Sequence, residues 1–257
     1  MSTAIKTPSK ATRCISIDFW RIVFSLMIVI CHASDLFPYM PDVFPTNGRP
    51  MRGAYIAVEF FGIVSGYLMV ASARKQERRN ENMDLGTETI CFMKRKIGKI
   101  YPYFFVSVII SFVLRQLFDK SSVRQVLSRA VKSIWELLLI RMSGINGYYN
   151  VGSGWYLSAM FIIMLAAYPL LRKTGNVFTH IIAPLTAILS MGHMSMVVKS
   201  ACANIPQVSG AWGMIRITMD ISIGCICYVI CEAITKVSLA FNDAQSWASL
   251  KHSASYV

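Results

Sequence analysis

The chain has 257 residues, of which 54% are hydrophobic and only 15% charged, and its mean hydropathy is +0.48. A soluble domain of this length needs more charged surface to stay in solution, so the composition indicates an integral membrane protein. The formal net charge of +13 is weak evidence for nucleic-acid binding, because the distribution of basic residues matters more than their total.

Basic residues gather in one segment between two apolar runs, residues 74–99. Eight of the 26 Lys and Arg lie there: Arg74, Lys75, Arg78, Arg79, Lys94, Arg95, Lys96 and Lys99. Short segments rich in Lys and Arg stay preferentially on the cytoplasmic side of a membrane. We therefore expect a cytoplasmic N-terminus, a cytoplasmic basic loop and no nucleic-acid partner. Segment 115–153 is also basic, which is unusual for an external loop.

Apolar runs of membrane-spanning length recur along the chain. A bilayer core of about 30 Å requires roughly 20 apolar residues per helix. We predict an all-α, polytopic transmembrane bundle of about six spans, at Ile15–Ala33, Ala54–Ala73, Ile100–Leu117, Gly154–Leu171, Val177–Val198 and Ala211–Cys231. Ser133–Ile140 is too short to span and is expected to form an interfacial or re-entrant helix. Residues 1–257 are treated as one membrane domain whose polar tail, from about Asn242, is expected to be frayed.

The first predicted span carries a polar face. Asp18, Arg21, Ser25 and His32 are spaced at i, i+3, i+7 and i+14, which places them on one side of a helix. Arg21 and His32 are separated by about 16 Å along the axis and about 20° around it. Ionisable groups within a membrane usually serve function. The alternative is an Asp18–Arg21 pair at an interface, with His32 as an interfacial side chain.

The second predicted span combines small residues with an acid. Glu59, Gly62 and Gly66 share one helical face, and the Gly-x-x-x-Gly spacing lets another helix approach closely. We interpret the glycines as packing residues. Glu59 and Ser65 either line a cavity or bond to a neighbouring helix, and the pattern favours neither.

The third predicted span opens with the basic run Lys94 to Lys99, followed by Ile100-Tyr101-Pro102. Basic residues at a membrane boundary are usually topology signals or contacts to anionic lipid. The functional alternative is capture of phosphate groups by ammonium and guanidinium groups.

Seven cysteines are present, most of them in apolar stretches. Cys225-Ile226-Cys227 lacks the partner spacing of a zinc site, so we expect small buried hydrophobic side chains and no metal.

Three motifs occur in order and in register with the predicted helices: Arg21-x10-His32, Phe60-Phe61 followed by Ser65-Gly66-Tyr67, and Lys96-x-x-Lys99-Ile100-x-Pro102. This trio resembles the acyltransferase 3 family of membrane O-acyltransferases, many of which acetylate cell-surface polysaccharides. Trp155-x-Leu157 resembles a helix opening in that family. Arg216, leading to Gly224, resembles its later arginine-bearing span. The resemblance covers roughly Ile17–Ile230.

The resemblance implies a bacterial inner-membrane enzyme that moves an acyl group from a donor such as acetyl-CoA to a hydroxyl of a glycan, with no bound cofactor. A hydroxyl is a poor nucleophile near neutral pH, and histidine is well suited to remove its proton. His32 is thus the expected base, or a transient acyl carrier, with Arg21 and Asp18 holding the polar stripe. The predicted donor-binding residues are Lys96, Lys99 and Arg95; the predicted cavity-lining residues are Glu59, Ser65, Tyr67, Trp155 and Arg216.

The sequence departs from the family at two points. The family usually has arginine where Lys96 and Lys99 stand, and lysine cannot grip a phosphate with a planar fork. The family typically has about ten spans, so a truncated C-terminus is expected here. The rival hypotheses are a transporter or flippase, whose path the polar stripe of the first span would line, and a non-catalytic remnant of the family.

Overall fold

The computed structural model describes residues 15–33, 52–79, 83–143, 149–152, 154–198 and 211–254, without the side chains at 32–33, 52, 55, 143, 197–198, 211 and 242–254. These residues form helices and turns, with no strand among them. The elements are α1 (Ile15–Ala33), η2 (Arg52–Tyr55), α2 (Ile56–Arg79), α3 (Leu85–Phe118), α4 (Val123–Leu137), η3 (Arg141–Ser143), α5 (Gly154–Thr174), η4 (Phe178–Ile182), α6 (Ala183–Val198) and α7 (Ala211–Ala254).

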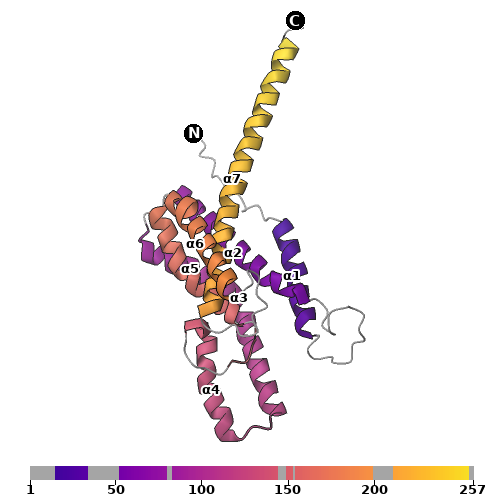
Figure 1. The fold of residues 1–257 in the computed structure, drawn as a ribbon, viewed down its shortest axis with the longest axis vertical. Helices are drawn as coiled ribbons and strands as arrows, with labels where there is room; N and C mark the ends of the chain where they lie inside the picture. Colours follow the sequence, from indigo (N-terminus) through magenta and orange to yellow (C-terminus); the bar gives the residue numbers. More distant parts are fainter. Residues whose placement is uncertain are drawn as a thin grey trace, which may run out of the picture. The chain divides into compact units, whose positions relative to one another are not determined.

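The chain divides into two units, residues 1–57 and 58–257, and each is described by itself. In the first unit α1 contacts the short helix η2. The second unit holds the remaining helices, shown in Figure 1 from purple α2 to yellow α7.

All six predicted spans are helical, which confirms the all-α transmembrane fold. Four helices in the described part of the chain are long and apolar enough to cross a membrane: α2, α3, α5 and residues Trp212–Phe241 of α7. A count of about six spans is not confirmed by this criterion. One reason is that α6 has only 16 residues and continues from the π-helical turn η4.

The basic segment 74–99 is largely helical, so the expectation of a long loop there is wrong. α2 continues to Arg79, and α3 begins at Leu85, fifteen residues before the predicted start of the third span. The Asp84 side chain accepts hydrogen bonds from the backbone N–H groups of Gly86 (3.0 Å) and Thr87 (3.2 Å), which satisfies two free donors of the first turn. Lys and Arg are good helix formers, so the run from Lys94 to Lys99 extends the helix.

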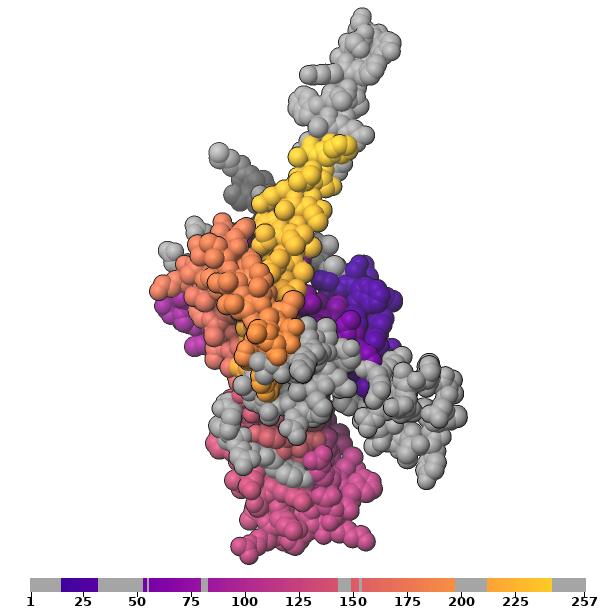
Figure 2. Space-filling model, viewed as in Figure 1, coloured from indigo at the N-terminus to yellow at the C-terminus, as the bar shows by residue number. Residues whose placement is uncertain are grey.

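Two further boundaries differ from the prediction. The short helix expected at Ser133–Ile140 is α4, which begins at Val123 and ends at Leu137. It lies beside the C-terminal half of α3 (Figure 1) and carries the buried Glu136 on its inner face. The backbone of the polar tail is helical as far as Ala254, so the expected fraying from Asn242 is wrong for that backbone. Figure 2 shows the yellow part of α7 extending past the helices it packs on.

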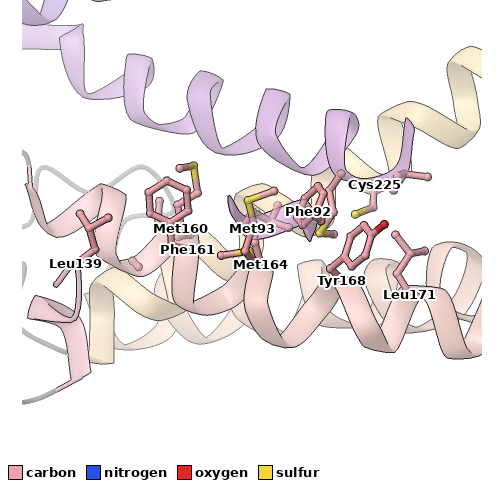
Figure 3. Close-up of a cluster of buried hydrophobic side chains, with 14 of the residues drawn as sticks. Phe92, Met93, Leu139, Met160, Phe161, Met164, Tyr168, Leu171 and Cys225 are labelled. Atoms are coloured by element: carbon pink, nitrogen blue, oxygen red, sulfur yellow. The ribbon is translucent and has the colours of Figure 1, made fainter. Parts of the chain in front are cut away.

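The core of the second unit is organised around α5. Met160, Met164 and Tyr168 of this helix are buried, in contact with side chains of α3 and α7 (Figure 3). The rings of Tyr168 and Phe92 stack in parallel with their centroids 4.0 Å apart, which fixes α5 against the N-terminal half of α3.

Glycines bring α2 and α7 into backbone contact, as the Gly-x-x-x-Gly spacing predicted. A Cβ atom on Gly66 would lie 2.1 Å from the carbonyl oxygen of Ile221, and one on Gly224 would lie 2.0 Å from that of Ile63. Only residues without side chains fit at these two positions. The contact places the polar residues of α2 directly against those of α7.

Candidate functional site

A buried ion pair joins α2 to α7. Both the Nε (3.0 Å) and Nη2 (2.6 Å) groups of Arg216 donate hydrogen bonds to Oε1 of Glu59. The two side chains are 3% and 10% exposed, so solvent screens their attraction little. Moving the helices so that one partner is lost would leave a buried charge without its counter-charge, which is costly. The pair therefore fixes the register of the two helices.

The other residues predicted to line a cavity also contact neighbouring helices. The guanidinium carbon of Arg216 lies 5.8 Å from the ring centroid of Trp155. The Ser65 hydroxyl lies 3.2 Å from the Met160 sulfur, and the ring of Tyr67 lies 5.3 Å from that of Tyr228. Glu59 and Ser65 thus bond to neighbouring helices, which is one of the two interpretations that the sequence left open; their role in lining a cavity stays a prediction.

Sequence reasoning missed Asp220, one helical turn after Arg216 on α7. It is fully buried, and neither carboxyl oxygen has a hydrogen-bond partner among the described residues. The signal that points to it is its spacing, since Asp220 follows Arg216 at i+4 within an apolar run. An acid at such a position belongs with the intramembrane groups that usually serve function.

A basic pocket of about 380 Å³ opens between the C-terminal end of α2 and the N-terminal part of α3. Its volume falls within the range of about 300–1,000 Å³ that is usual for small-molecule sites. Three of its side chains are cationic, and the full lining is Gln76, Arg79, Met83, Glu88, Cys91, Lys94 and Arg95. Arg95, which the sequence predicted to bind the donor, lines the pocket. Arg79 and Lys94 line it as well, although they were not predicted to bind the donor; they come together only through the packing of α2 on α3.

The other two predicted donor-binding residues lie outside the lining of this pocket. The Lys96 ammonium is 5.8 Å from the centroid of the Phe92 ring. Lys99 is exposed and follows Arg95 by four residues, so it lies on the same face of α3, about 6 Å further along the axis. Arg95 and Lys99 thus form a basic stripe leading away from the pocket.

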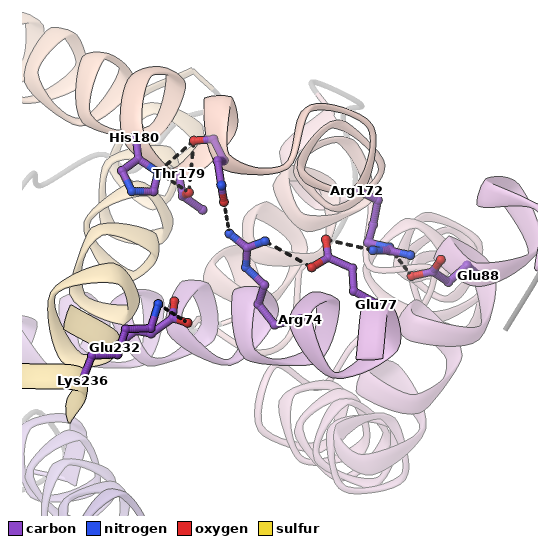
Figure 4. A network of polar contacts seen from close by, with 9 residues as sticks. Arg74, Glu77, Glu88, Arg172, Thr179, His180, Glu232 and Lys236 are labelled. Carbon is purple, nitrogen blue, oxygen red and sulfur yellow. Dashed lines mark hydrogen bonds and ion pairs between the residues drawn. The ribbon is translucent and has the colours of Figure 1, made fainter. Parts of the chain in front are cut away.

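A network of ion pairs supports the inner wall of the pocket (Figure 4). Oε1 of the buried Glu88 accepts a hydrogen bond from Nε of Arg172 at 2.7 Å, as Figure 4 shows. The same oxygen accepts a hydrogen bond from the Tyr168 hydroxyl at 2.6 Å. Arg172 also pairs with Glu77 at 3.1 Å, and Glu77 pairs with Arg74 at 3.1 Å. The network ties the ends of α2, α3 and α5 together.

The same network reaches the start of the next helix. Arg74 also hydrogen-bonds to the Asn176 side chain, and Nδ1 of His180 lies 2.9 Å from the Asn176 carbonyl oxygen (Figure 4). The basic pocket is therefore backed by side chains with fixed partners on four elements, α2, α3, α5 and the turn that leads into η4.

In the first unit, α1 carries the predicted polar stripe. Nη1 of Arg21 donates to Oδ1 of Asp18 at 3.3 Å, and the two side chains are 40% and 27% exposed. His32 lies in the last turn of α1, and its side chain is outside the described residues. Within the described part of the chain, no group of three or more His, Cys, Asp or Glu side chains lies close enough to hold a metal ion.

These observations define a polytopic helical membrane protein with buried charges at one helix contact and a basic pocket at the end of α2. The family model described as an acyltransferase domain, acyltransferase 3, matches residues 15–198, which is more than half of the chain. The chain belongs to this family of membrane acyltransferases. No curated protein and no solved structure matches it.

Proposed function

We propose that the protein transfers an acyl group, such as acetyl, from acyl-CoA to a hydroxyl of a glycan, and that the basic pocket binds the phosphates of the donor. The observation that carries this proposal is the convergence of Arg79, Lys94 and Arg95 on one pocket in a member of an acyltransferase family. Coenzyme A carries a pyrophosphate and a ribose phosphate, and guanidinium and ammonium groups are the usual protein ligands of phosphate.

One acid, Glu88, lines the pocket in which the phosphates are proposed to bind. Its carboxylate accepts hydrogen bonds from Tyr168 and Arg172, neither of which lines the pocket. The positive charge of Arg172 offsets the repulsion that a bare carboxylate would exert on a bound phosphate. Lys96 and Lys99 retain their proposed role as further contacts to the donor, because the stripe from Arg95 to Lys99 leads onward from the pocket.

The proposed chemistry is a direct transfer assisted by His32. Its imidazole takes the proton of the acceptor hydroxyl while the hydroxyl oxygen attacks the thioester carbonyl. The carbon–sulfur bond then breaks, and the thiolate of coenzyme A leaves and takes up a proton, so that an ester and a free thiol result. Arg21, paired with Asp18, would keep the face of α1 that carries His32 polar. In the proposed orientation the N-terminus and the basic pocket face the cytoplasm of a bacterium, where acyl-CoA is made.

Donor binding tests this proposal directly. Replacing Lys94 and Arg95 together by Gln should weaken the binding of acetyl-CoA to the purified chain by about a hundredfold or more, because each charge-assisted hydrogen bond contributes about 1.5–3 kcal/mol. Lys173→Gln is the matched control, since Lys173 is an exposed cation at the end of α5 that does not line the pocket. Binding of S-acetylpantetheine, which lacks the pyrophosphate and ribose phosphate, should not change. Equal acetyl-CoA affinity in the double variant and the control would contradict the proposed donor site.

Transport is the second candidate function, because Glu59, Arg216 and Asp220 are charged or titratable groups buried between apolar helices. The two functions differ in whether acyl-CoA is consumed. An acyltransferase forms an ester only when acyl-CoA is supplied, whereas a transporter moves its substrate without acyl-CoA. Ester formation on a glycan acceptor in membranes that contain the chain, dependent on added acyl-CoA, would favour the first; its absence would favour transport or a non-catalytic family member.

A further inference from the structure

In the part of the chain that the structure describes, three ionisable side chains meet at the contact between α2 and α7, two of them acids and one a base. Oε1 of Glu59 accepts hydrogen bonds from Nε and Nη2 of Arg216, whereas Oε2 of Glu59 is buried and has no hydrogen-bond partner among the described residues. Asp220 is 0% exposed, and within the described part of the chain neither of its carboxyl oxygens has a hydrogen-bond partner. Among the described residues, the charged groups that act on Asp220 are Glu59, which repels its carboxylate, and Arg216, which attracts it. One guanidinium thus faces two carboxyl groups.

Asp220 lies in the helix contact itself, where Gly62 makes room for it. A Cβ atom added to Gly62 would lie 2.5 Å from Cβ of Asp220 and 2.9 Å from its Oδ2. The carboxyl group therefore rests against the backbone of α2, three residues along the same helix face from Glu59. The site depends on both helices, because α7 supplies the acid and α2 supplies the space.

The charge balance of this site indicates that it binds a proton. With both carboxyl groups ionised, the cluster would carry one uncompensated negative charge between apolar helices, which is costly inside a membrane. One bound proton makes the cluster neutral, and it also supplies the O–H donor that the unpartnered oxygens lack. A metal cation fits poorly, because it needs several oxygen ligands and Arg216 would repel it. We propose that Glu59 and Asp220 form an acid pair that holds one proton between α2 and α7.

Proton occupancy then determines which helix Arg216 is bound to. While the proton is present, the ionised Glu59 binds Arg216 across the contact. When it leaves, Asp220 competes for the same guanidinium from its own helix, one turn away. The acid pair therefore couples a proton to the contact between α2 and α7. This inference is independent of the proposed acyl-transfer function.

Infrared spectroscopy of the purified chain tests the proposal, in a detergent without ester groups at neutral pH. A neutral carboxylic acid gives a carbonyl band that ionised carboxylates lack and that shifts in heavy water. The wild-type chain should show this band, and it should be lost in Asp220→Asn, which leaves only the ionised Glu59. It should also be lost in Glu59→Gln, because Asp220 is then the only carboxyl group beside Arg216 and ionises.

Glu136→Gln is the matched control, since Glu136 is 1% exposed but its two carboxyl oxygens already accept three hydrogen bonds from N–H groups of Asn150 and Val151. Its replacement should leave the band unchanged. Absence of the band in the wild-type chain would overturn the proposal, and so would a band that persists in Glu59→Gln. If Asp220→Asn fails to fold, Glu59→Gln alone decides the question, because a Gln oxygen still accepts from Arg216. A wild-type band that disappears when sodium is added would show that a metal cation replaces the proton, which also overturns it.

Discussion

The contact between α2 and α7 yields the most quantitative prediction. A methyl group at Gly224 would lie 2.0 Å from the carbonyl oxygen of Ile63 and 2.8 Å from the backbone nitrogen of Tyr67. Both neighbours are backbone atoms, so no side chain can rotate away. To bring the closer pair to 3.4 Å, the lower edge of ordinary contact, the two helices would have to separate by about 1.4 Å.

Separating the two helices by this distance costs free energy, because it also pulls apart the other buried side chains that pack at the same contact. Overpacking a well-packed site costs about 1–3 kcal/mol, and more where the backbone must move. We therefore expect Gly224→Ala to lower the free energy of unfolding by about 3 kcal/mol or more. A change of 1 kcal/mol shifts the Tm of a chain of this size by about 2–4 °C, so the Tm should fall by about 6 °C or more.

Thermal unfolding of the purified chain in detergent measures this change, with Gly192→Ala as the control. A Cβ atom at Gly192, within α6, meets nothing within 4 Å. Because alanine favours the helix over glycine by about 1 kcal/mol, that variant should be as stable as the wild type or slightly more stable. If the two variants have the same Tm, α2 and α7 do not pack through Gly224 as described, and the arrangement of Glu59 and Asp220 at that contact is wrong.

Three further predictions concern the inner network, the catalytic base and the orientation. Glu88→Gln should destabilise the chain by about 1–3 kcal/mol in the same thermal assay, because two donors lose a buried charged acceptor. Glu232→Gln, which removes the acid of an exposed i,i+4 pair, should change stability by no more than about 0.5 kcal/mol. His32→Ala should reduce acyl transfer by about 10²–10⁴-fold at equal protein level while acetyl-CoA binding is retained. After removal of the native cysteines, a cysteine near Arg78 should react with an impermeant label only in opened membranes, and one near Asn47 should react from outside.

Each of these predictions has an outcome that contradicts it. Equal stability of the Glu88 and Glu232 variants would mean that the ion-pair network does not hold the helix ends. Near-normal transfer by His32→Ala would remove the proposed base and favour the transport hypothesis. The reverse labelling pattern would place the basic pocket on the external side, where cytoplasmic acyl-CoA cannot reach it.

The sequence alone determined the class of this protein and much of its helix content. The length and apolarity of each run predicted α1, α2, α5 and α7, because a membrane span is a local property of about 20 residues. The Gly62-x-x-x-Gly66 spacing predicted a close helix contact, since the absence of side chains on one face is visible in the sequence. The i,i+3 spacing offered the Asp18–Arg21 pair as the alternative to a functional polar stripe, and the structure contains that pair. The three ordered motifs identified the family.

Only the tertiary structure determined which groups meet. Glu59 and Arg216 are 157 residues apart, and nothing in either segment names the other as its partner. Asp220 stands out only because α7 packs against Gly62, where its buried carboxyl oxygens have no hydrogen-bond donor among the described residues. The basic pocket required Arg79 of α2 and Lys94 of α3 to converge. Helix formation follows from neighbouring residues, whereas ion pairs and pockets between helices depend on packing that no single segment encodes.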